Sequence, residues 1–183
     1  MKVLLGVTGS VAATLTKKMV EALHEAGHEV QVVATNQSQY FFSKKCLGVK
    51  VWTDGDEWPH ASYEKGEDVL HIKLRDWADV LLIAPLTANT LAKVANGMSD
   101  NLLTGVVRAW NLRKAMIVAP AMNTMMWDNP FTSRHLETIR EVYSTSVVNP
   151  VSKMLACGDE GVGAMASIHD IVEIVDTVNI SAE

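Results

Sequence analysis

The chain has 183 residues, of which 48% are hydrophobic and 20% charged, a balance typical of one soluble globular domain with a substantial core. Its formal net charge of −5, without any block of like charges, argues against binding to nucleic acid or to an anionic membrane surface. No apolar stretch approaches the ~20 residues of a membrane span, and the two cysteines are too few for a disulfide framework, so we expect one cytoplasmic domain over residues 1–183 with reduced thiols.

The first half of the chain alternates predicted strands and helices. Residues 2–8 form a continuous apolar run that predicts a buried strand, and the apolar spacing of residues 11–26 predicts the helix after it. Residues 29–35 predict a second strand, followed by a helix beginning near Ser38. Residues 53–67 are polar and contain Gly and Pro, which indicates a connection.

The second half continues this alternation. Its predicted strands cover residues 78–85, 115–121 and 144–150, and its predicted helices cover 88–97, 99–110 and 168–178. Strands that are apolar throughout and separated by helices predict an α/β fold, a doubly wound, Rossmann-like parallel sheet with helices on both faces. Ligands of such sheets bind at the carboxyl ends of the strands. The candidate site therefore lies in the loops TGSVA (8–12), TNQS (35–38), PLTANT (85–90) and PAMN (120–123).

The loop GVTGSVAA (6–13) follows a strand and opens a helix, where backbone N–H groups favour an anion. It lacks the third glycine of a dinucleotide fingerprint and the Gly-Lys-Ser/Thr of a P-loop. The second strand ends in residues 35–38 without the acidic residue that an NAD site places there. A mononucleotide or sugar-phosphate chain fits this pattern, and the alternative is a tight turn without a ligand.

Three polar residues, Thr87, Asn89 and Thr90, stand at the predicted helix start after the third strand. Such side chains cap a helix or hold a phosphate, and three within four residues favour ligand contact. In contrast, His24 and His28 match a zinc motif only formally, because Gly27 ends the helix between them. We therefore predict no metal site.

Three further features carry candidate chemistry. His71 lies in an apolar stretch, where a structural role and a role as general base are both open. Cys157 lies at the base of the segment ACGDEGVGAM (156–165), whose glycines are typical of a mobile flap over residues 152–166. This cysteine is either a small apolar residue or a nucleophile or proton donor. PAMNTMMW (120–127) is either Met-rich core or part of a ligand site, because Asn123 interrupts it.

The segments TGSVAA, PLTANTLAKVANGMSDNLLT, APAMNTMMW and LACGDEGVGAM, in this order and spacing, resemble the flavin-dependent cysteine decarboxylase (HFCD) family over residues 2–175. The resemblance implies a flavoprotein that binds FMN at the subunit interfaces of a homotrimer. It is closest to a stand-alone eukaryotic branch that decarboxylates 4'-phosphopantothenoylcysteine to 4'-phosphopantetheine and CO₂ in coenzyme A biosynthesis. Bacterial versions are fused to a ligase domain, and the end of this chain at Glu183 leads us to expect the stand-alone form.

The resemblance also implies roles for individual residues. His71 assists a deprotonation, Asn123 holds the substrate carboxylate, and Cys157 protonates a late intermediate. The residues that bind FMN are Gly9, Ser10, Val11, Ala12, Thr35, Ser38, Thr87, Ala88, Asn89, Thr90 and Ala121. The residues that bind substrate are Asn123, Met126, Ala156 and Met165.

In the family mechanism, the substrate thiol is oxidised to a thioaldehyde, CO₂ is lost, and the resulting enethiol is reduced again. Two features depart from the pattern: TNQS is less basic or hydroxyl-rich than in relatives, and Met154 stands where a basic residue contacts the substrate phosphate, a role open to Lys153. One alternative function is a peptidyl-cysteine decarboxylase, which lacks the flap cysteine. The other is a non-catalytic regulatory subunit of a protein phosphatase, which the presence of both His71 and Cys157 disfavours.

Overall fold

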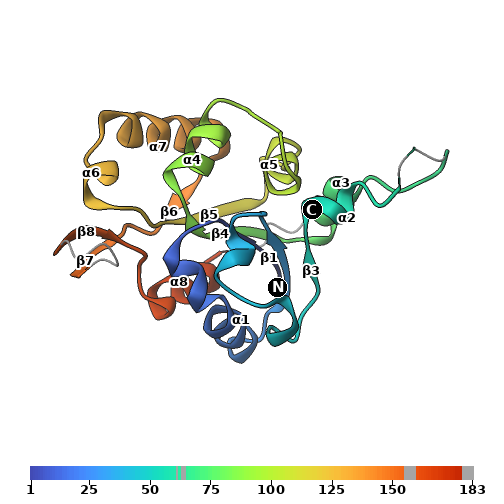
Figure 1. Ribbon diagram of the computed structural model, residues 1–183, viewed down its shortest axis with the longest axis horizontal. Coiled ribbons are helices and arrows are strands. Elements are labelled where there is room, and N and C mark those ends of the chain that lie inside the picture. Colours follow the sequence, from blue (N-terminus) through green and yellow to red (C-terminus); the bar gives the residue numbers. More distant parts are fainter. Residues whose placement is uncertain (61, 63–64, 155–159, 179–183) are drawn as a thin grey trace.

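The computed structural model describes residues 1–60, 62, 65–154 and 160–178 of the chain. Within them, six parallel strands form one sheet in the order β3-β2-β1-β4-β5-β6 (Figure 1). The bounds of these strands are β1 Lys2–Val7, β2 Glu29–Ala34, β3 Val51–Trp52, β4 Val80–Leu86, β5 Ala115–Pro120 and β6 Ser146–Val147. The order reverses direction between β1 and β4, so the expected doubly wound, Rossmann-like sheet is confirmed.

Helices cover both faces of the sheet (Figure 1). Helices α1 and α8 lie on one face, whereas α3, α4, α5 and α7 pack on the other. The bounds of the helices are α1 Thr16–Glu25, α2 Asp54–Glu57, α3 Leu70–Trp77, α4 Ala88–Ala95, α5 Leu102–Arg108, α6 Thr124–Trp127, α7 Pro130–Tyr143 and α8 Ile168–Asp176. The short helices α2 and α6 stand at opposite ends of the molecule in this view.

The apolar runs of the central strands supply two cores at once, because successive side chains point to opposite faces of a sheet. Leu4 of β1 joins Leu81 and Ile83 of β4 in the core beneath α3, α4, α5 and α7. Val3 and Leu5 of β1 belong to the core beneath α1 and α8. All five side chains are fully buried, which explains why these strands are apolar throughout rather than alternating.

The helix predicted to begin near Ser38 is wrong. The segment forms two short 3-10 helices, Ser38–Tyr40 and Lys44–Cys46. Ser38 is buried, and its hydroxyl donates to the carbonyl of Thr35 at 2.8 Å instead of capping a helix. The aromatic residues that follow have only modest helix propensity, so nothing extends the first turn into an α-helix.

Other boundaries also differ from the predictions. The helix expected over residues 11–26 begins as a 3-10 helix, Val11–Leu15, before α1. The strand expected over 144–150 shrinks to β6, because Ser144 ends α7 in a left-handed conformation and only Ser146 and Val147 pair with β5. Within the predicted flap segment, β7 (Val151–Met154) and β8 (Glu160–Ala164) form an antiparallel pair outside the main sheet.

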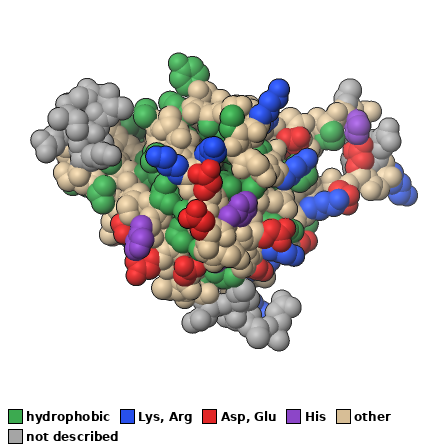
Figure 2. Space-filling view, turned by 90° about the horizontal axis from the view of Figure 1, so that it is seen from below, with side chains coloured by type: hydrophobic (Ala, Val, Ile, Leu, Met, Phe, Trp, Pro, Cys, Tyr) green, Lys and Arg blue, Asp and Glu red, His purple; other side chains and the backbone are tan. Residues whose placement is uncertain are grey.

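The surface and the helix lengths give two further observations. Figure 2 shows acidic and basic side chains interspersed over the face seen from below, rather than gathered into one patch of a single charge. Among the described residues, no helix combines the length and the apolar character needed to cross a bilayer. The structural features that could position a ligand instead lie at the carboxyl edge of the sheet.

Candidate functional site

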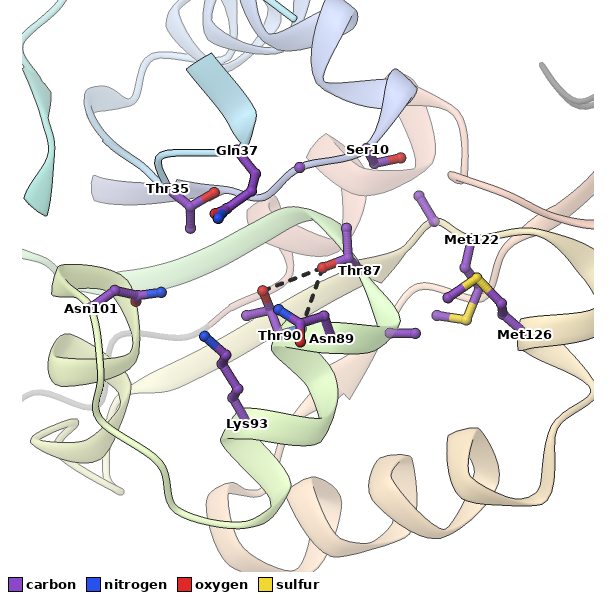
Figure 3. A pocket seen from close by; sticks show the side chains of 13 residues that line it. Ser10, Thr35, Gln37, Thr87, Asn89, Thr90, Lys93, Asn101, Met122 and Met126 are labelled. Atoms are coloured by element: carbon purple, nitrogen blue, oxygen red, sulfur yellow. Dashed lines mark hydrogen bonds between the residues drawn. The ribbon is translucent and has the colours of Figure 1, made fainter. Parts of the chain in front are cut away.

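A cavity of about 320 Å³ opens at the carboxyl edge of the sheet, where the four predicted loops meet (Figure 3). The residues that line it are Gly9, Ser10, Thr35, Gln37, Thr87, Ala88, Asn89, Thr90, Lys93, Asn101, Ala121, Met122 and Met126. Three of the residues expected at a cofactor, Val11, Ala12 and Ser38, do not line it. Val11 and Ala12 lie in the 3-10 helix after Ser10, and Ser38 is buried behind Thr35.

The first two loops approach each other closely at Gly9. A Cβ atom on this residue would stand 2.6 Å from the Cβ of Gln37, so only glycine allows the two loops this separation. Next to it, the hydroxyl of Ser10 accepts from the backbone N–H of Ala12 at 3.3 Å and caps the 3-10 helix. The cavity wall here is therefore formed by backbone and small polar groups, as a phosphate-bearing ligand requires.

The third loop is fixed to the first by one buried hydroxyl. Thr8 donates from Oγ1 to the carbonyl of Pro85 at 2.7 Å and accepts from the backbone N–H of Thr87 at 3.0 Å. Thr87 in turn accepts through Oγ1 from the backbone N–H of Thr90 at 3.3 Å and is the N-cap of α4. The N-terminus of α4, with its partial positive charge, thus borders the cavity.

A cation also borders this wall. Lys93 lies one turn beyond Thr90 on α4, lines the cavity, and forms an ion pair with Asp100 (Figure 3). The hydrogen bond that its ammonium donates to Asp100 lowers the pKa of that carboxyl below its ordinary value, which outweighs the opposing effect of partial burial. The helix N-terminus, the hydroxyls and Lys93 together form a donor set suited to an anion.

The opposite end of the cavity is apolar. Ala121 is buried, and its backbone N–H donates to the carbonyl of Leu86 at 2.9 Å, which brings the fourth loop against the third. Met122 and Met126 lie together at this end in Figure 3, away from Lys93 and Asn101. Met122 is 9% exposed but Met126 is 48% exposed, so membership of the core explains only the first of them.

Asn123 lies between these two methionines and begins α6. Its side-chain oxygen accepts from the backbone N–H of Met125 at 2.8 Å, which makes it the N-cap of that helix. The backbone of the preceding Met122 donates to the carbonyl of Gly163 in β8 at 2.9 Å. The hairpin formed by β7 and β8 is thus attached to the loop that carries Asn123.

His71 lies in a second cavity, of about 340 Å³. Its Nδ1 is 2.6 Å from Oε1 of Glu57, and its backbone N–H donates to Oε2 of the same carboxylate at 3.1 Å. The ring packs against Gly105 of α5, where a Cβ atom would stand 3.6 Å from the ring. Asn101, the N-cap of α5, lines both cavities and is the link between them.

The remaining residues predicted for the site either lie outside the two cavities or lie outside the described part of the chain. Met165 is half-buried and packs against the core beneath α1 and α8 rather than lining either cavity. Ala156 and Cys157 lie outside the described residues, so the structure places neither. His28, from the rejected zinc motif, directly precedes β2 and lies 2.8 Å through Nε2 from Oδ1 of Asp176, and it lines neither cavity.

Sequence reasoning missed several residues of the site. Lys93 could have been found, because it lies three residues after Thr90 on a predicted helix and therefore on the same face. Asn101 also had a signal, since it precedes Thr104 in a capping box. Glu57 had none, because it comes from a polar connection and meets His71 only in the folded chain.

Comparisons with known proteins show the family to which the chain belongs. The family model described as Flavoprotein matches residues 1–179. A rice protein named phosphopantothenoylcysteine decarboxylase is 53% identical over 168 residues, covering 90% of this chain and 74% of the relative. A solved structure of a PPC decarboxylase mutant complexed with pantothenoylaminoethenethiol is 47% identical, covers 96% of both chains and has a TM-score of 0.90.

A second solved structure, the FMN-binding protein AtHal3, is 48% identical, with a TM-score of 0.86, and covers 96% of this chain and 94% of its own. The resemblance inferred from the four sequence segments is therefore confirmed. The chain belongs to the flavoprotein family, in which its close relatives are named phosphopantothenoylcysteine decarboxylases.

Proposed function

We propose that this protein is an FMN-dependent decarboxylase that converts 4'-phosphopantothenoylcysteine to 4'-phosphopantetheine in coenzyme A biosynthesis. The observation that carries this proposal is the first cavity, with an anion-binding wall at one end and the loop of Asn123 at the other. It occurs in a chain whose fold matches the ligand-bound PPC decarboxylase mutant over 96% of its length.

The cavity fits FMN in the chemistry of its two ends. Ser10, Thr87, Asn89 and Thr90 would hold the phosphate and the ribityl chain, because they supply hydroxyls, an amide and a helix N-terminus. The small, buried Ala121 would lie against the ring system. When bound, FMN supplies the two-electron oxidation and reduction that make the loss of CO₂ from a cysteine carboxylate possible.

The protein's own residues would orient the substrate and move protons. Because the side-chain oxygen of Asn123 accepts from Met125, its amide nitrogen is the donating end, and this is the group that a substrate carboxylate needs. Met126, exposed beside it, would shape the pocket. His71 would accept a proton from the substrate, and Cys157, outside the described residues, would return one at the end of the reaction.

The positions of these residues support a site completed by a second copy of the chain. His71 belongs to α3, and Asn123 immediately precedes α6; the two helices lie at opposite ends of the molecule (Figure 1). A single copy therefore does not bring the two side chains to one substrate. We infer that the protein acts as a homotrimer, with FMN at each interface and His71 and Asn123 supplied by different copies.

The reaction is tested by incubating the purified protein with phosphopantothenoylcysteine and weighing the product by mass spectrometry. We expect a yellow protein that releases FMN on denaturation, and a product lighter than the substrate by CO₂ alone. A product that has also lost two hydrogens would assign the protein to the oxidative peptidyl-cysteine type. Colourless protein that does not take up FMN would contradict every flavin-dependent function.

The shared site is tested by complementation. Oligomers of His71→Asn and of Asn123→Asp are mixed, dissociated and reassembled, and the activity is compared with that of each variant alone. If the two residues act across an interface, hybrid oligomers contain some sites with both native side chains and regain activity. If both residues come from one copy, every hybrid site still lacks one of them, and the mixture stays inactive.

A further inference from the structure

We propose that Glu57 is a positioning residue for His71, which fixes the ring in the tautomer that can accept a proton at Nε2. The inference rests on the proposed function, in which His71 accepts a proton from the substrate. It arises from two contacts made by one carboxylate. Oε1 of Glu57 is 2.6 Å from Nδ1 of His71, and Oε2 accepts from the backbone N–H of the same residue at 3.1 Å.

The tautomer follows from the chemistry of the carboxylate. An ionised carboxylate only accepts hydrogen bonds, so beside an ionised Glu57 the Nδ1 of His71 carries the proton of this bond. In a neutral ring the lone pair is then on Nε2. When Nε2 accepts a proton, the same carboxylate stabilises the resulting imidazolium, in the way that a carboxylate supports histidine in other general bases.

Burial makes this contact more effective than a surface pair. The side chain of Glu57 is 7% exposed and that of His71 is 30% exposed, so water competes little for the carboxylate. His71 and Glu57 both line the second cavity. Because the side chain of His71 is the more exposed of the two, it is the one accessible to a ligand there.

The carboxylate itself is held in place by the short helix that carries it. Thr53 begins α2 with a capping box, in which its backbone N–H and its hydroxyl both donate to Asp56 at 2.7 Å. Helix α2 is also attached to α5: Oδ1 of Asp54 accepts at 2.9 Å from the backbone N–H of Leu102, which is the first residue of α5. Helix α2 therefore contacts both α3 and α5, and His71 packs against α5 at Gly105.

A purely structural role for Glu57 is the alternative explanation. Helix α3 has no side-chain cap of its own at Val69, so the bond from the backbone of His71 to Glu57 replaces one. This cap involves only the backbone, whereas the positioning role involves Nδ1. Replacing Glu57 by glutamine separates the capping role from the positioning role. The single side-chain oxygen of glutamine replaces at most one of the two carboxylate oxygens, and its NH₂ group presents a hydrogen-bond donor instead.

The test is Glu57→Gln, studied in the holoprotein by ¹⁵N NMR of labelled histidine at about pH 8.5, well above the ordinary imidazole pKa of about 6.5. The His71 signals are assigned by their loss in His71→Asn. We expect the native ring to be in the Nδ1–H form and the variant to shift towards the Nε2–H form. With phosphopantothenoylcysteine, kcat should fall about 10²-fold, the lower end of what a general base contributes, while KM changes less than about twofold.

Asp176→Asn is the matched control, because Asp176 is also paired with a histidine, His28, but neither residue lines either cavity. It should leave kcat and the His71 signals unchanged. An unaltered tautomer of His71, or a kcat within twofold of the native value in Glu57→Gln, would overturn the proposal. The NMR result does not depend on the reaction, so a native protein that fails to decarboxylate the substrate contradicts the proposed function and still leaves the positioning role tested.

Discussion

The backbone N–H of Met122 donates to the carbonyl of Gly163 at 2.9 Å, and this bond joins the loop of Asn123 to the β7-β8 hairpin. Gly163 has a φ of +151°, and a Cβ atom on it would stand 2.2 Å from the carbonyl oxygen of Met122. Both features require glycine at this position. The sequence segment predicted as a substrate flap is thus attached to the predicted carboxylate site through a contact between two backbones.

Gly163→Ala should therefore detach the hairpin from the loop. We expect a loss of about 2 kcal/mol in the free energy of unfolding, because an added methyl group must displace backbone rather than a side chain. Decarboxylation should fall as well, since Asn123 follows Met122 directly. Urea unfolding and steady-state kinetics measure the two effects.

Gly27→Ala is the control for backbone strain alone. Gly27 also has a positive φ, of +83°, but nothing lies within 4 Å of an added Cβ atom. It should cost about 1 kcal/mol and leave kcat unchanged. If both variants lose the same stability and both keep full activity, the contact between Met122 and Gly163 has no role in the reaction.

Asn123→Asp should separate the role of this residue as the N-cap of α6 from its proposed role in binding the substrate carboxylate. Aspartate caps helices as well as asparagine does, so α6 should remain intact and the free energy of unfolding should change by less than about 0.5 kcal/mol. A second carboxylate beside the substrate carboxylate should nevertheless lower kcat/KM about 10²-fold or more by repulsion. Full activity in this variant would show that Asn123 is only a cap.

The sequence predicted the central sheet because β1 and β4 are buried on both faces and thus appear as uninterrupted apolar runs. It did not reveal α7, although Asn129 as cap and Pro130 at the first helical position are a standard start signal. The helix at Ser38 was predicted from a capping residue alone, and the hydroxyl turned out to bond back to Thr35. A capping residue alone is thus not sufficient to predict a helix; the apolar periodicity of the residues that follow is needed as well.

The site was predictable to the extent that it depends on strand order. Loops that follow parallel strands must meet at one edge, so Thr87 and Ala121 could be placed in one cavity from the sequence. The pairing of Glu57 with His71 could not, since it depends on how α2 packs between α3 and α5. The separation of α3 from α6 along the molecule also could not be predicted from the sequence.

Thr87→Ala should weaken both α4 and the binding of FMN. Loss of the bond from the N–H of Thr90 should cost about 1 kcal/mol of stability. Loss of a hydroxyl at the cavity wall should raise the Kd of FMN about tenfold, as for one hydrogen bond to a charged group. Fluorescence titration of the apoprotein with FMN measures the second effect.

Ser167→Ala provides the matched control, because Ser167 caps α8 through the N–H of Asp170 and lies away from the cavity. It should lose a similar amount of stability and bind FMN with unchanged Kd. Equal weakening of FMN binding in both variants would mean that the effect of Thr87→Ala comes from general destabilisation rather than from the cavity wall.

The ion pair between Lys93 and Asp100 should give the stability a dependence on acid pH. The folded-state pKa of Asp100 is lowered, chiefly by the hydrogen bond from Lys93, so the folded protein binds this proton less readily than the unfolded chain. The stabilisation is therefore complete above the ordinary carboxyl pKa of about 3.9 and is lost as the pH falls through the lower folded value.

A double-mutant cycle with Lys93→Met and Asp100→Asn should give a coupling of about 0.2–1 kcal/mol at pH 6, as for pairs near the surface, and a smaller one at pH 3. Because Asp100 is 45% exposed, the coupling at pH 6 should also shrink in 1 M salt. A coupling that persists unchanged at pH 3 would contradict the assignment of the pH dependence to this carboxyl.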